Sequence, residues 1–360
     1  MNFAFRADAS LTIGTGHVMR CLTLARELRA LGNACRFVCR DMPGGFGALV
    51  AAEFPLSLLP APKGPSPQGQ PTHAAWAGVD WARDVVETRA AVGKVDWLVV
   101  DHYAFDARWQ AAARPACKRL MVIDDLADRP HTCELLLDQN LGHEALDYDG
   151  LAPDSCTRLI GPRYALLRPE FAQVRASALS DRSGRGCRNL LITMGGVDPA
   201  DATSQVLRAL QAASLPEDLR IMVVMGGRAP ALEQVRVLAR RMPRPTEIAV
   251  DVTDMAARMA WADLAIAAAG ATTWERCSLG LPTIIVQIAA NQAGIARALS
   301  DAGAALDPGP LHAPEFQRKL QAALLQASSQ LCAMSKRAAD ICDGDGTTRV
   351  VAALQMELVK

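Results

Sequence analysis

A short stretch near the start of the chain combines two glycines with a histidine. Gly14 and Gly16 directly precede His17, after a short apolar segment, Phe3–Phe5. Glycines between a strand and a helix let backbone N–H groups approach an anionic or sugar ligand closely. His17 falls on the first turn of the predicted helix, where the helix dipole disfavours the imidazolium form. We therefore predict that His17 is a neutral imidazole that can accept a proton.

Two similar turns occur in the second half of the chain. Gly195 and Gly196 follow one apolar segment, and Gly270, Thr272 and Thr273 follow another. Such turns can bind a diphosphate through backbone amides and threonine hydroxyls, with the helix dipole attracting the charge. The alternative is that each glycine only permits a tight strand-to-helix turn.

An acidic residue follows the second of these turns. Glu275 lies three residues after Thr272, on the first turns of the predicted helix. A carboxylate there can accept hydrogen bonds from both ribose hydroxyls of a nucleotide. The alternative is a solvated helix residue whose charge favours the positive end of the dipole.

Polar residues also close several apolar segments of the first half. Asp8, Asp101, Tyr103, Asp124 and Asn140 each follow such a segment. Because the carboxyl ends of parallel strands line the ligand crevice of an α/β sheet, these side chains should converge on one edge. We expect the turn that carries His17 to lie at the same edge.

A metal site is not predicted from these residues. Asp101, His102 and Asp124 are possible ligands, but their spacing matches no known metal motif. No cofactor is predicted either. The remaining histidines are interpreted as surface or capping residues, namely His73, His131, His143 and His312.

Short apolar segments alternate with amphipathic ones along the whole chain. The first amphipathic segment carries an apolar stripe at helical spacing from Val18 to Leu31. A proline-rich excursion, Pro60–Pro71, has five prolines in twelve residues and excludes regular structure. The alternation predicts an α/β protein with two Rossmann-like domains that face a cleft. The boundaries are a first domain at 1–165, a polar and basic linker at 166–186 and a second domain at 187–360.

Composition narrows the class of protein. The 360 residues include 38 basic and 38 acidic side chains, so nothing favours binding to nucleic acid or to an anionic membrane. No apolar run approaches the length of a membrane span, and no signal region is recognised at the start. The ten cysteines are scattered and form no Cys-x-x-Cys, as expected for reduced thiols in a cytoplasmic protein.

A family resemblance emerges from these residues taken together. The pattern from Arg6 to Arg20 resembles the N-terminal signature of the UDP-2,4-diacetamido-2,4,6-trideoxy-β-L-altropyranose hydrolases of pseudaminic acid biosynthesis. The resemblance covers roughly residues 1–300. It continues in the same order through Asp101-His102-Tyr103, Asp124-Asp125, Cys133 to Asn140, Tyr164-Ala165-Leu166, Met194-Gly195-Gly196-x-Asp198 and Glu275. The second-half motifs are shared more widely by glycosyltransferases of the two-domain GT-B fold, including the MurG type. The proline-rich excursion looks like an addition.

The resemblance implies a chemistry. His17 would activate a water that attacks the anomeric carbon and releases UDP, with Tyr103 positioning the water. The glycine turns would hold the diphosphate, and Glu275 the ribose. The sugar would contact Asp8, Asp101, Asp124 and Asn140. Arg6, Asn291 and Gln292 complete the predicted substrate-binding set.

Three other activities remain open. A GT-B glycosyltransferase with a UDP-N-acetylhexosamine donor would use the same fold and nucleotide site, with an acceptor hydroxyl in place of water. A non-catalytic module would bind the nucleotide sugar without turnover. An epimerase would invert the sugar at its second carbon.

Overall fold

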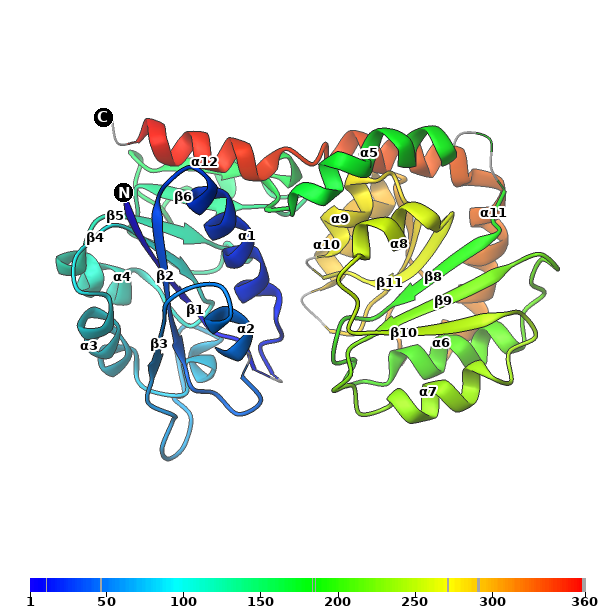
Figure 1. Cartoon of the computed structure of the whole chain (residues 1–360), viewed down its shortest axis with the longest axis horizontal. Coiled ribbons are helices and arrows are strands. Elements are labelled where there is room, and N and C mark those ends of the chain that lie inside the picture. Colours follow the sequence, from blue (N-terminus) through cyan, green and yellow to red (C-terminus); the bar gives the residue numbers. More distant parts are fainter. Residues whose placement is uncertain are drawn as a thin grey trace. The chain divides into compact units, whose positions relative to one another are not determined.

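The computed structural model describes residues 1–10, 12–45, 47–182, 184, 186–270, 272–289 and 292–357. These residues form two compact units. Unit 1 consists of Met1–Leu166 together with Asp345–Lys360, and unit 2 of Leu167–Gly344. Each unit is a parallel α/β sheet covered by helices on both faces (Figure 1). Two Rossmann-like units are therefore present, as the alternation of segments predicts.

The sheet of unit 1 has the strand order β3-β2-β1-β4-β5-β6-β7, and every described pair is parallel. The strands are β1 (Asn2–Ala7), β2 (Ala34–Arg40), β3 (Leu56–Leu59), β4 (Val95–Asp101), β5 (Cys117–Ile123), β6 (Leu135–Asp138) and β7 (Thr157–Ile160). Successive side chains of a strand point to opposite faces. Phe3 and Phe5 thus pack with one group of helices, whereas Ala4 packs with another.

Five α-helices of unit 1 cover these faces. They are α1 (Gly16–Ala30), α2 (Gly47–Ala51), α3 (Trp81–Val92), α4 (Ala107–Ala113) and α12 (Gly346–Met356). Helices α1 and α12 pack on the Phe3 face, and α3 and α4 on the Ala4 face (Figure 1). Single turns of 3-10 helix occur at η1 (Ala74–Ala77), η2 (Arg114–Ala116), η3 (Ala145–Tyr148) and η4 (Pro162–Tyr164).

Unit 2 repeats the architecture with the strand order β10-β9-β8-β11-β12-β13. Its strands are β8 (Asn189–Thr193), β9 (Arg220–Met225), β10 (Thr246–Val250), β11 (Leu264–Ala268), β12 (Thr283–Val286) and β13 (Ala305–Leu306). Its helices are α5 (Pro169–Arg182), α6 (Ala202–Gln211), α7 (Leu232–Ala239), α8 (Met255–Trp261), α9 (Thr272–Ser278), α10 (Ala293–Asp301) and α11 (Phe316–Ile341). Helices α6, α7 and α11 pack on one face of this sheet, and α5 and α8 on the other.

Both sheets reverse their strand order beside the first strand. In unit 1 the chain moves outward through β2 and β3 and then continues on the other side of β1 with β4. In unit 2 the corresponding neighbours are β8 and β11. Ligands of open α/β sheets bind at such switch points, beyond the carboxyl ends of the strands. His17 follows β1, and the two second-half glycine turns follow β8 and β11.

The division of the chain differs from the predicted boundaries at two places. Most of the predicted 166–186 linker is helix α5, which packs on unit 2 through Phe171 and Ala178. Helix α12, which was expected in the second domain, returns to unit 1 and buries Val350 and Leu354 in its core. The apolar side chains of these two helices determine which unit each one joins.

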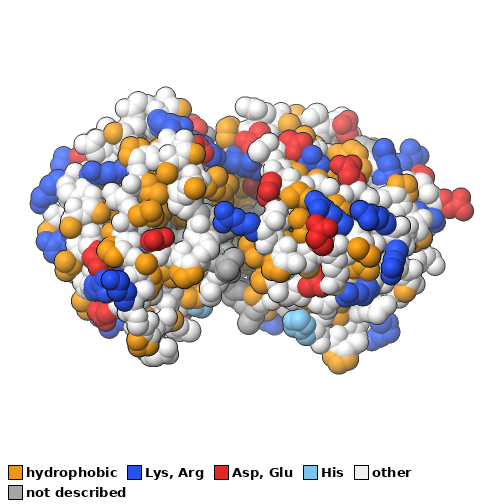
Figure 2. Space-filling view, turned by 60° about the horizontal axis from the view of Figure 1, so that its bottom comes forward, with side chains coloured by type: hydrophobic (Ala, Val, Ile, Leu, Met, Phe, Trp, Pro, Cys, Tyr) orange, Lys and Arg blue, Asp and Glu red, His pale blue; other side chains and the backbone are white. Residues whose placement is uncertain are grey.

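The surface carries charges of both signs. On the face shown in Figure 2, basic and acidic side chains are interspersed over both units. Within the described ranges, no helix combines the length and the apolar character that crossing a bilayer requires.

Candidate active site

A hydrogen bond joins His17 to the end of strand β4. Helix α1 begins at Gly16, so His17 stands on its first turn with a side chain that is 8% exposed. Its Nδ1 lies 2.5 Å from Oδ1 of Asp101, the last residue of β4, whose carboxylate is fully buried. The helix that follows β1 and the end of the neighbouring strand β4 therefore supply the two partners.

The charge of Asp101 determines which imidazole nitrogen is free. Burial alone would raise the pKa of this carboxyl, but Arg20 and His17 outweigh burial and hold the pKa well below its usual range. An ionised carboxylate only accepts hydrogen bonds, so Nδ1 of His17 must carry the hydrogen. In the neutral ring this tautomer leaves the lone pair on Nε2, which is then the atom at which His17 accepts a proton.

Arg20 connects this pair to a second carboxylate. Its Nε and Nη2 donate to the two oxygens of Asp101 at 2.6 and 2.7 Å, and its Nη1 donates to Asp125 Oδ2 at 2.6 Å. The hydroxyl of Tyr103 donates to the same Asp125 oxygen at 2.6 Å. Burial and the charge of Asp125 raise the pKa of Tyr103 well above its ordinary value. Tyr103 is therefore a neutral phenol, fixed at its hydroxyl end.

Aromatic rings surround His17. The Tyr103 ring lies edge-to-face with it at 4.6 Å between centroids, and Trp76 does so at 6.2 Å. Trp76 also stacks on Tyr103 at 5.4 Å, and His73 lies 4.7 Å from Trp76. His73 was predicted to be a surface or capping residue, but it belongs to this cluster. The sequence shows no pattern that links residues 73 and 76 to His17.

Arg6 and Asp8 lie inside the domain in a closed ionic network. Both side chains are fully buried, and Arg6 donates to Asp8 at 2.5 and 2.9 Å and to Asp84 at 2.7 Å. The backbone N–H of Arg40 donates to Asp8 at 2.7 Å, and Nε2 of His102 lies 3.3 Å from it. The carboxylate of Asp8 is thus surrounded by protein donors, which points to a structural role rather than the predicted sugar contact.

Asp124 and Asn140 lie at the ends of β5 and β6, near Asp125. Asp124 is fully buried, 2.8 Å from Arg129, and accepts a hydrogen bond from the Tyr148 hydroxyl at 3.0 Å. The side-chain amide of Asn140 donates to the carbonyl oxygen of Asp125 at 3.1 Å. Strand ends thus converge at one edge of the sheet as expected, but the Asp124 carboxylate is engaged by protein groups.

The first glycine turn of unit 2 borders open space. Gly195 has a φ of +91°, which an L side chain rarely adopts, and a Cβ on Gly195 or Gly196 would meet no atom within 4 Å. Asp198 follows and accepts from the N–H groups of Ala202 and Thr203, both at 2.9 Å. The turn is therefore held by its own aspartate, while its glycines leave room beside the backbone.

The second turn is organised by a buried arginine. Arg276 donates to Thr272 Oγ1 at 3.0 Å, to Thr273 Oγ1 at 3.2 Å and to the Ala268 carbonyl at 3.0 Å. Burial lowers the pKa of Arg276 to about 10. The N–H of Thr273 bonds to the Gly270 carbonyl at 2.9 Å. Both threonine hydroxyls thus accept from Arg276, and Gly270 is the open part of the turn, since a Cβ there meets nothing within 4 Å.

Glu275 lies one turn into α9 and is largely buried, with a side chain that is 15% exposed. Its Oε1 is 3.6 Å from Nη2 of Arg168. Burial raises the pKa of Glu275 to about 7, against the opposing effect of Arg168. Gln292 accepts from the N–H of Ile288 at 3.0 Å. Asn291 lies outside the described residues.

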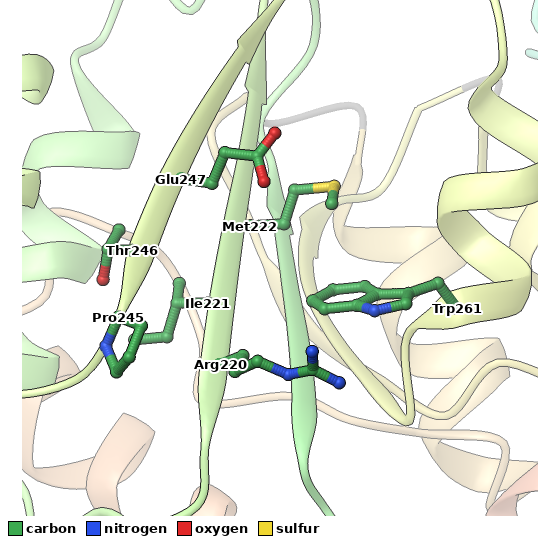
Figure 3. Close-up of a pocket in the computed structure, with 7 residues that line it drawn as sticks. All are labelled: Arg220, Ile221, Met222, Pro245, Thr246, Glu247 and Trp261. Carbon is green, nitrogen blue, oxygen red and sulfur yellow. The ribbon is translucent and has the colours of Figure 1, made fainter.

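A separate pocket lies at the amino ends of strands β9 and β10. About 440 Å³ in volume, it is lined by Arg220, Ile221, Met222, Pro245, Thr246, Glu247 and Trp261. In Figure 3 the guanidinium of Arg220 and the Trp261 indole face each other beside the first residues of β9 and β10. The glycine turns lie at the carboxyl ends of the strands, so this pocket is not part of them. Among the described side chains, no group of three or more His, Cys, Asp or Glu is arranged to hold a metal ion.

Comparisons with known proteins follow the division into units. The model of the glycosyltransferase family 28 C-terminal domain matches residues 190–341, within unit 2. The spore coat polysaccharide biosynthesis protein SpsG of Bacillus subtilis is 32% identical over 197 residues, 54% of this chain and 57% of that protein. The match thus spans little more than half of SpsG.

Two further proteins resemble most of the chain. The UDP-2,4-diacetamido-2,4,6-trideoxy-beta-L-altropyranose hydrolase of Campylobacter jejuni is 26% identical over 242 residues, 67% of this chain and 75% of the hydrolase. The crystal structure of MurG from Acinetobacter baumannii has a TM-score of 0.69 at 20% identity and covers 99% of both chains. The chain therefore has the GT-B-like fold of MurG, which confirms the predicted fold class.

Proposed function

We propose that this protein hydrolyses a UDP-linked 2,4-diacetamido-2,4,6-trideoxyhexose to UDP and the free sugar. The observation that carries the proposal is the pairing of His17 Nδ1 with the Asp101 carboxylate at 2.5 Å. This pairing leaves Nε2 as a proton acceptor at the switch point of the first sheet. A histidine oriented by a carboxylate is a common general base.

His17 would remove a proton from a water molecule through Nε2. The water oxygen then bonds to the anomeric carbon, and the bond between that carbon and the β-phosphate oxygen breaks. UDP leaves with the electron pair of that bond. A positioned general base contributes roughly 10²–10⁴-fold to such a step. Asp101 stabilises the imidazolium that forms, and Arg20 fixes the carboxylate.

The nucleotide would bind to unit 2. Gly195, Gly196 and Gly270 offer open backbone for the diphosphate, and Glu275 would accept hydrogen bonds from the ribose. Preorganised backbone donors stabilise a departing anion without reorganisation. Arg276 would hold the threonine side chains of the second turn in place.

The choice of sugar rests on the sequence. The N-terminal signature residues Arg6, Asp8, Gly14, Gly16 and His17 are those of the resemblance to the altropyranose hydrolases. The similarity to the Campylobacter jejuni hydrolase over 67% of this chain supports the same substrate class.

Isotope labelling tests the reaction. The purified protein is incubated with the UDP-diacetamido sugar in ¹⁸O-labelled water, with no acceptor, and both products are weighed by mass spectrometry. We expect ¹⁸O in the free sugar, because water attacks carbon. Label in the nucleotide would place the attack at phosphorus and remove His17 from the proposed role.

Glycosyl transfer from a UDP-N-acetylhexosamine is a second candidate. The match of residues 190–341 to a glycosyltransferase domain and the MurG-like fold favour it. His17 would then deprotonate an acceptor hydroxyl instead of water. The two candidates differ in whether UDP is released without an acceptor. A His17→Asn variant that retains UDP binding is the control for both, since it should release no UDP.

A further inference from the structure

We propose that Trp76 is a substrate-specificity residue that contacts the apolar face of the sugar beside His17. The inference rests on the proposed function, because it assumes a sugar whose reacting carbon lies near His17. It assigns a role to the proline-rich excursion, which the resemblance leaves unexplained.

Contacts at both ends of the proline-rich excursion hold the residues that follow it, 73–78, in place. The carbonyl of Pro60 accepts from Arg40, and that of Gln70 accepts from Arg108 at 2.9 Å. Gly78, beyond the excursion, has a φ of +69°, and a Cβ there would lie 2.4 Å from Cγ of Pro62. Only glycine therefore fits where the chain returns beside the start of the excursion. Most of residues 63–70 are exposed, but the 3-10 turn η1 that follows the excursion is anchored by the buried Ala77.

Trp76 is the large side chain that this turn carries. It is half-buried, and its ring stacks on Tyr103 at an interplanar angle of 28°. The hydroxyl of Tyr103 donates a hydrogen bond to Asp125, and its ring contacts the His17 ring. The Tyr103 ring on which Trp76 stacks is therefore held in one orientation. Arg129 adds a cation 5.7 Å from the centre of the Tyr103 ring.

His73 completes a cluster of rings. It lies 4.7 Å from Trp76 and 5.6 Å from Tyr103. Burial lowers the pKa of His73, so its ring is neutral at pH 7 and adds little charge to this cluster of rings. His17 is thus bordered by Tyr103 and Trp76, and His73 packs against both of these rings.

The distance from His17 to the attacked carbon is similar to the distance between the His17 and Trp76 rings. A water activated by His17 lies about 3 Å from Nε2, and the carbon it attacks lies about 3 Å further on. The centre of the Trp76 ring is 6.2 Å from that of His17. A sugar placed for attack on the Trp76 side of His17 would be at contact distance from the indole. A 2,4-diacetamido-6-deoxyhexose presents three methyl groups that an indole can cover, whereas N-acetylglucosamine presents one.

Binding in an inactive background tests the contact without requiring turnover. His17→Asn is combined with Trp76→Leu or Trp76→Phe, and Kd is measured by calorimetry for UDP, the UDP-diacetamido-trideoxy sugar and UDP-N-acetylglucosamine. We expect Trp76→Leu to weaken the diacetamido sugar about tenfold more than UDP-N-acetylglucosamine, the usual scale for one lost apolar contact. UDP should bind equally to all variants, and Trp76→Phe should retain most of the preference.

Trp81→Phe is the matched control. Trp81 also lies in unit 1 and packs near Arg108, but it has no ring contact with the cluster around His17. It should bind all three ligands like the parent. Circular dichroism and thermal unfolding show whether each variant is folded.

The outcomes separate this inference from the proposed reaction. Equal sugar preference in the parent and in a folded Trp76→Leu variant overturns the role of Trp76, whatever the reaction. A preference that depends on Trp76, in a protein whose wild type releases no UDP from the diacetamido sugar, supports the contact and overturns the hydrolysis. If neither sugar binds more tightly than UDP alone, the contact is overturned as well.

Discussion

Asp101 binds His17 and Arg20 at the same time, through both oxygens of one buried carboxylate. His17 Nδ1 is 2.5 Å from Oδ1, and Arg20 donates to both oxygens at 2.6 and 2.7 Å. The carboxylate therefore fixes the imidazole in one tautomer, while the guanidinium fixes the carboxylate. Substitutions at different points of this series of hydrogen bonds should affect activity and stability differently.

Asp101→Asn should lower kcat for UDP release by about 10²–10⁴-fold, because the amide no longer stabilises the imidazolium or specifies its tautomer. UDP affinity should not change, since the glycine turns proposed to bind the nucleotide belong to unit 2. Asp96→Asn, at the opposite end of β4, is the control and should keep its activity. The double variant with His17→Asn should be no slower than His17→Asn alone. Additive losses would show that the two residues act independently.

Tyr103→Phe should keep the ring contact with His17 and lose only the hydrogen bond to Asp125. Arg20 still satisfies that oxygen, so we expect a loss in kcat of about tenfold or less and a stability cost of about 1 kcal/mol. Tyr148→Phe removes a buried hydroxyl from Asp124 and Asp138 and serves for comparison. It should affect the unfolding midpoint without affecting kcat. A Tyr103→Phe variant as slow as His17→Asn would assign the hydroxyl a direct part in the reaction.

Alanine at Gly195 and at Gly196 separates backbone strain from obstruction of the ligand. Both substitutions put a methyl group into open space, so each should weaken UDP binding, by roughly tenfold. Only Gly195 has positive φ, and Gly195→Ala should therefore also cost about 1–2 kcal/mol of unfolding free energy. Calorimetry with UDP and urea unfolding measure the two effects. Unchanged UDP affinity in both variants would exclude this turn from the nucleotide site.

Glu275 should make unit 2 less stable as pH rises. Its folded pKa of about 7 lies above the ordinary value of 4.5, so the folded state binds the extra proton. The stabilisation is complete below pH 4.5 and is lost as pH rises through 7, by at most about 3 kcal/mol. Glu275→Gln should remove this dependence of the unfolding free energy on pH. The measurement is the difference in unfolding free energy between wild type and variant at each pH from 5 to 8. Parallel curves would contradict the raised pKa.

The same proton should oppose ribose binding. A carboxylate that accepts two hydroxyl groups must be ionised, so the affinity for a UDP-sugar should increase between pH 6 and 8. A UDP-sugar is the appropriate probe because its diphosphate diester does not titrate in this range. Glu275→Gln should bind more weakly and without this pH dependence.

Asp8→Asn distinguishes a structural role from a sugar contact. Removing one charge from a buried pair costs about 3–5 kcal/mol, because Arg6 is left partly uncompensated. Arg6 and His102 outweigh burial and hold the pKa of Asp8 well below its usual range, so its contribution is present at neutral pH and lost in acid. We expect a lower unfolding temperature with a KM within about threefold of wild type at 15 °C. A large increase in KM in a stable variant would restore Asp8 to the sugar site.

Apolar patterning predicts strands at 56–59, 189–193, 264–268 and 283–286 and a helix at 81–92. Strands β3, β8, β11 and β12 and helix α3 have these bounds. The apolar stripe of α1 is buried through Leu28, but Leu31 is 53% exposed and ends the helix. Strands β7 and β10 are not predicted, because each is a short edge strand that begins with two polar residues, whereas the edge strand β3 contains three leucines.

The site is predicted less completely, for reasons of distance along the chain. His17 follows from its place after the glycines, and Asp101 from its place at a strand end. Asp101 binds His17 rather than a ligand because β1 and β4 lie side by side. These contacts join residues far apart in the chain, since Arg20 and Asp101 are separated by 81 positions. His73 and Trp76 directly follow the proline-rich excursion, where no periodicity indicates that they reach the site.

Helix α12 closes a core that begins with β1. Residues 345–357 leave the ribosome after the whole of unit 2, yet Val350, Val351 and Leu354 fill the same core as Phe3 and Phe5. During synthesis, all strands of the first sheet are made while one face of it is covered by α1 but not yet by α12. Unit 2 is continuous from Leu167 to Gly344 and needs no later residue. The first Rossmann unit therefore cannot complete its core until the second has been synthesised.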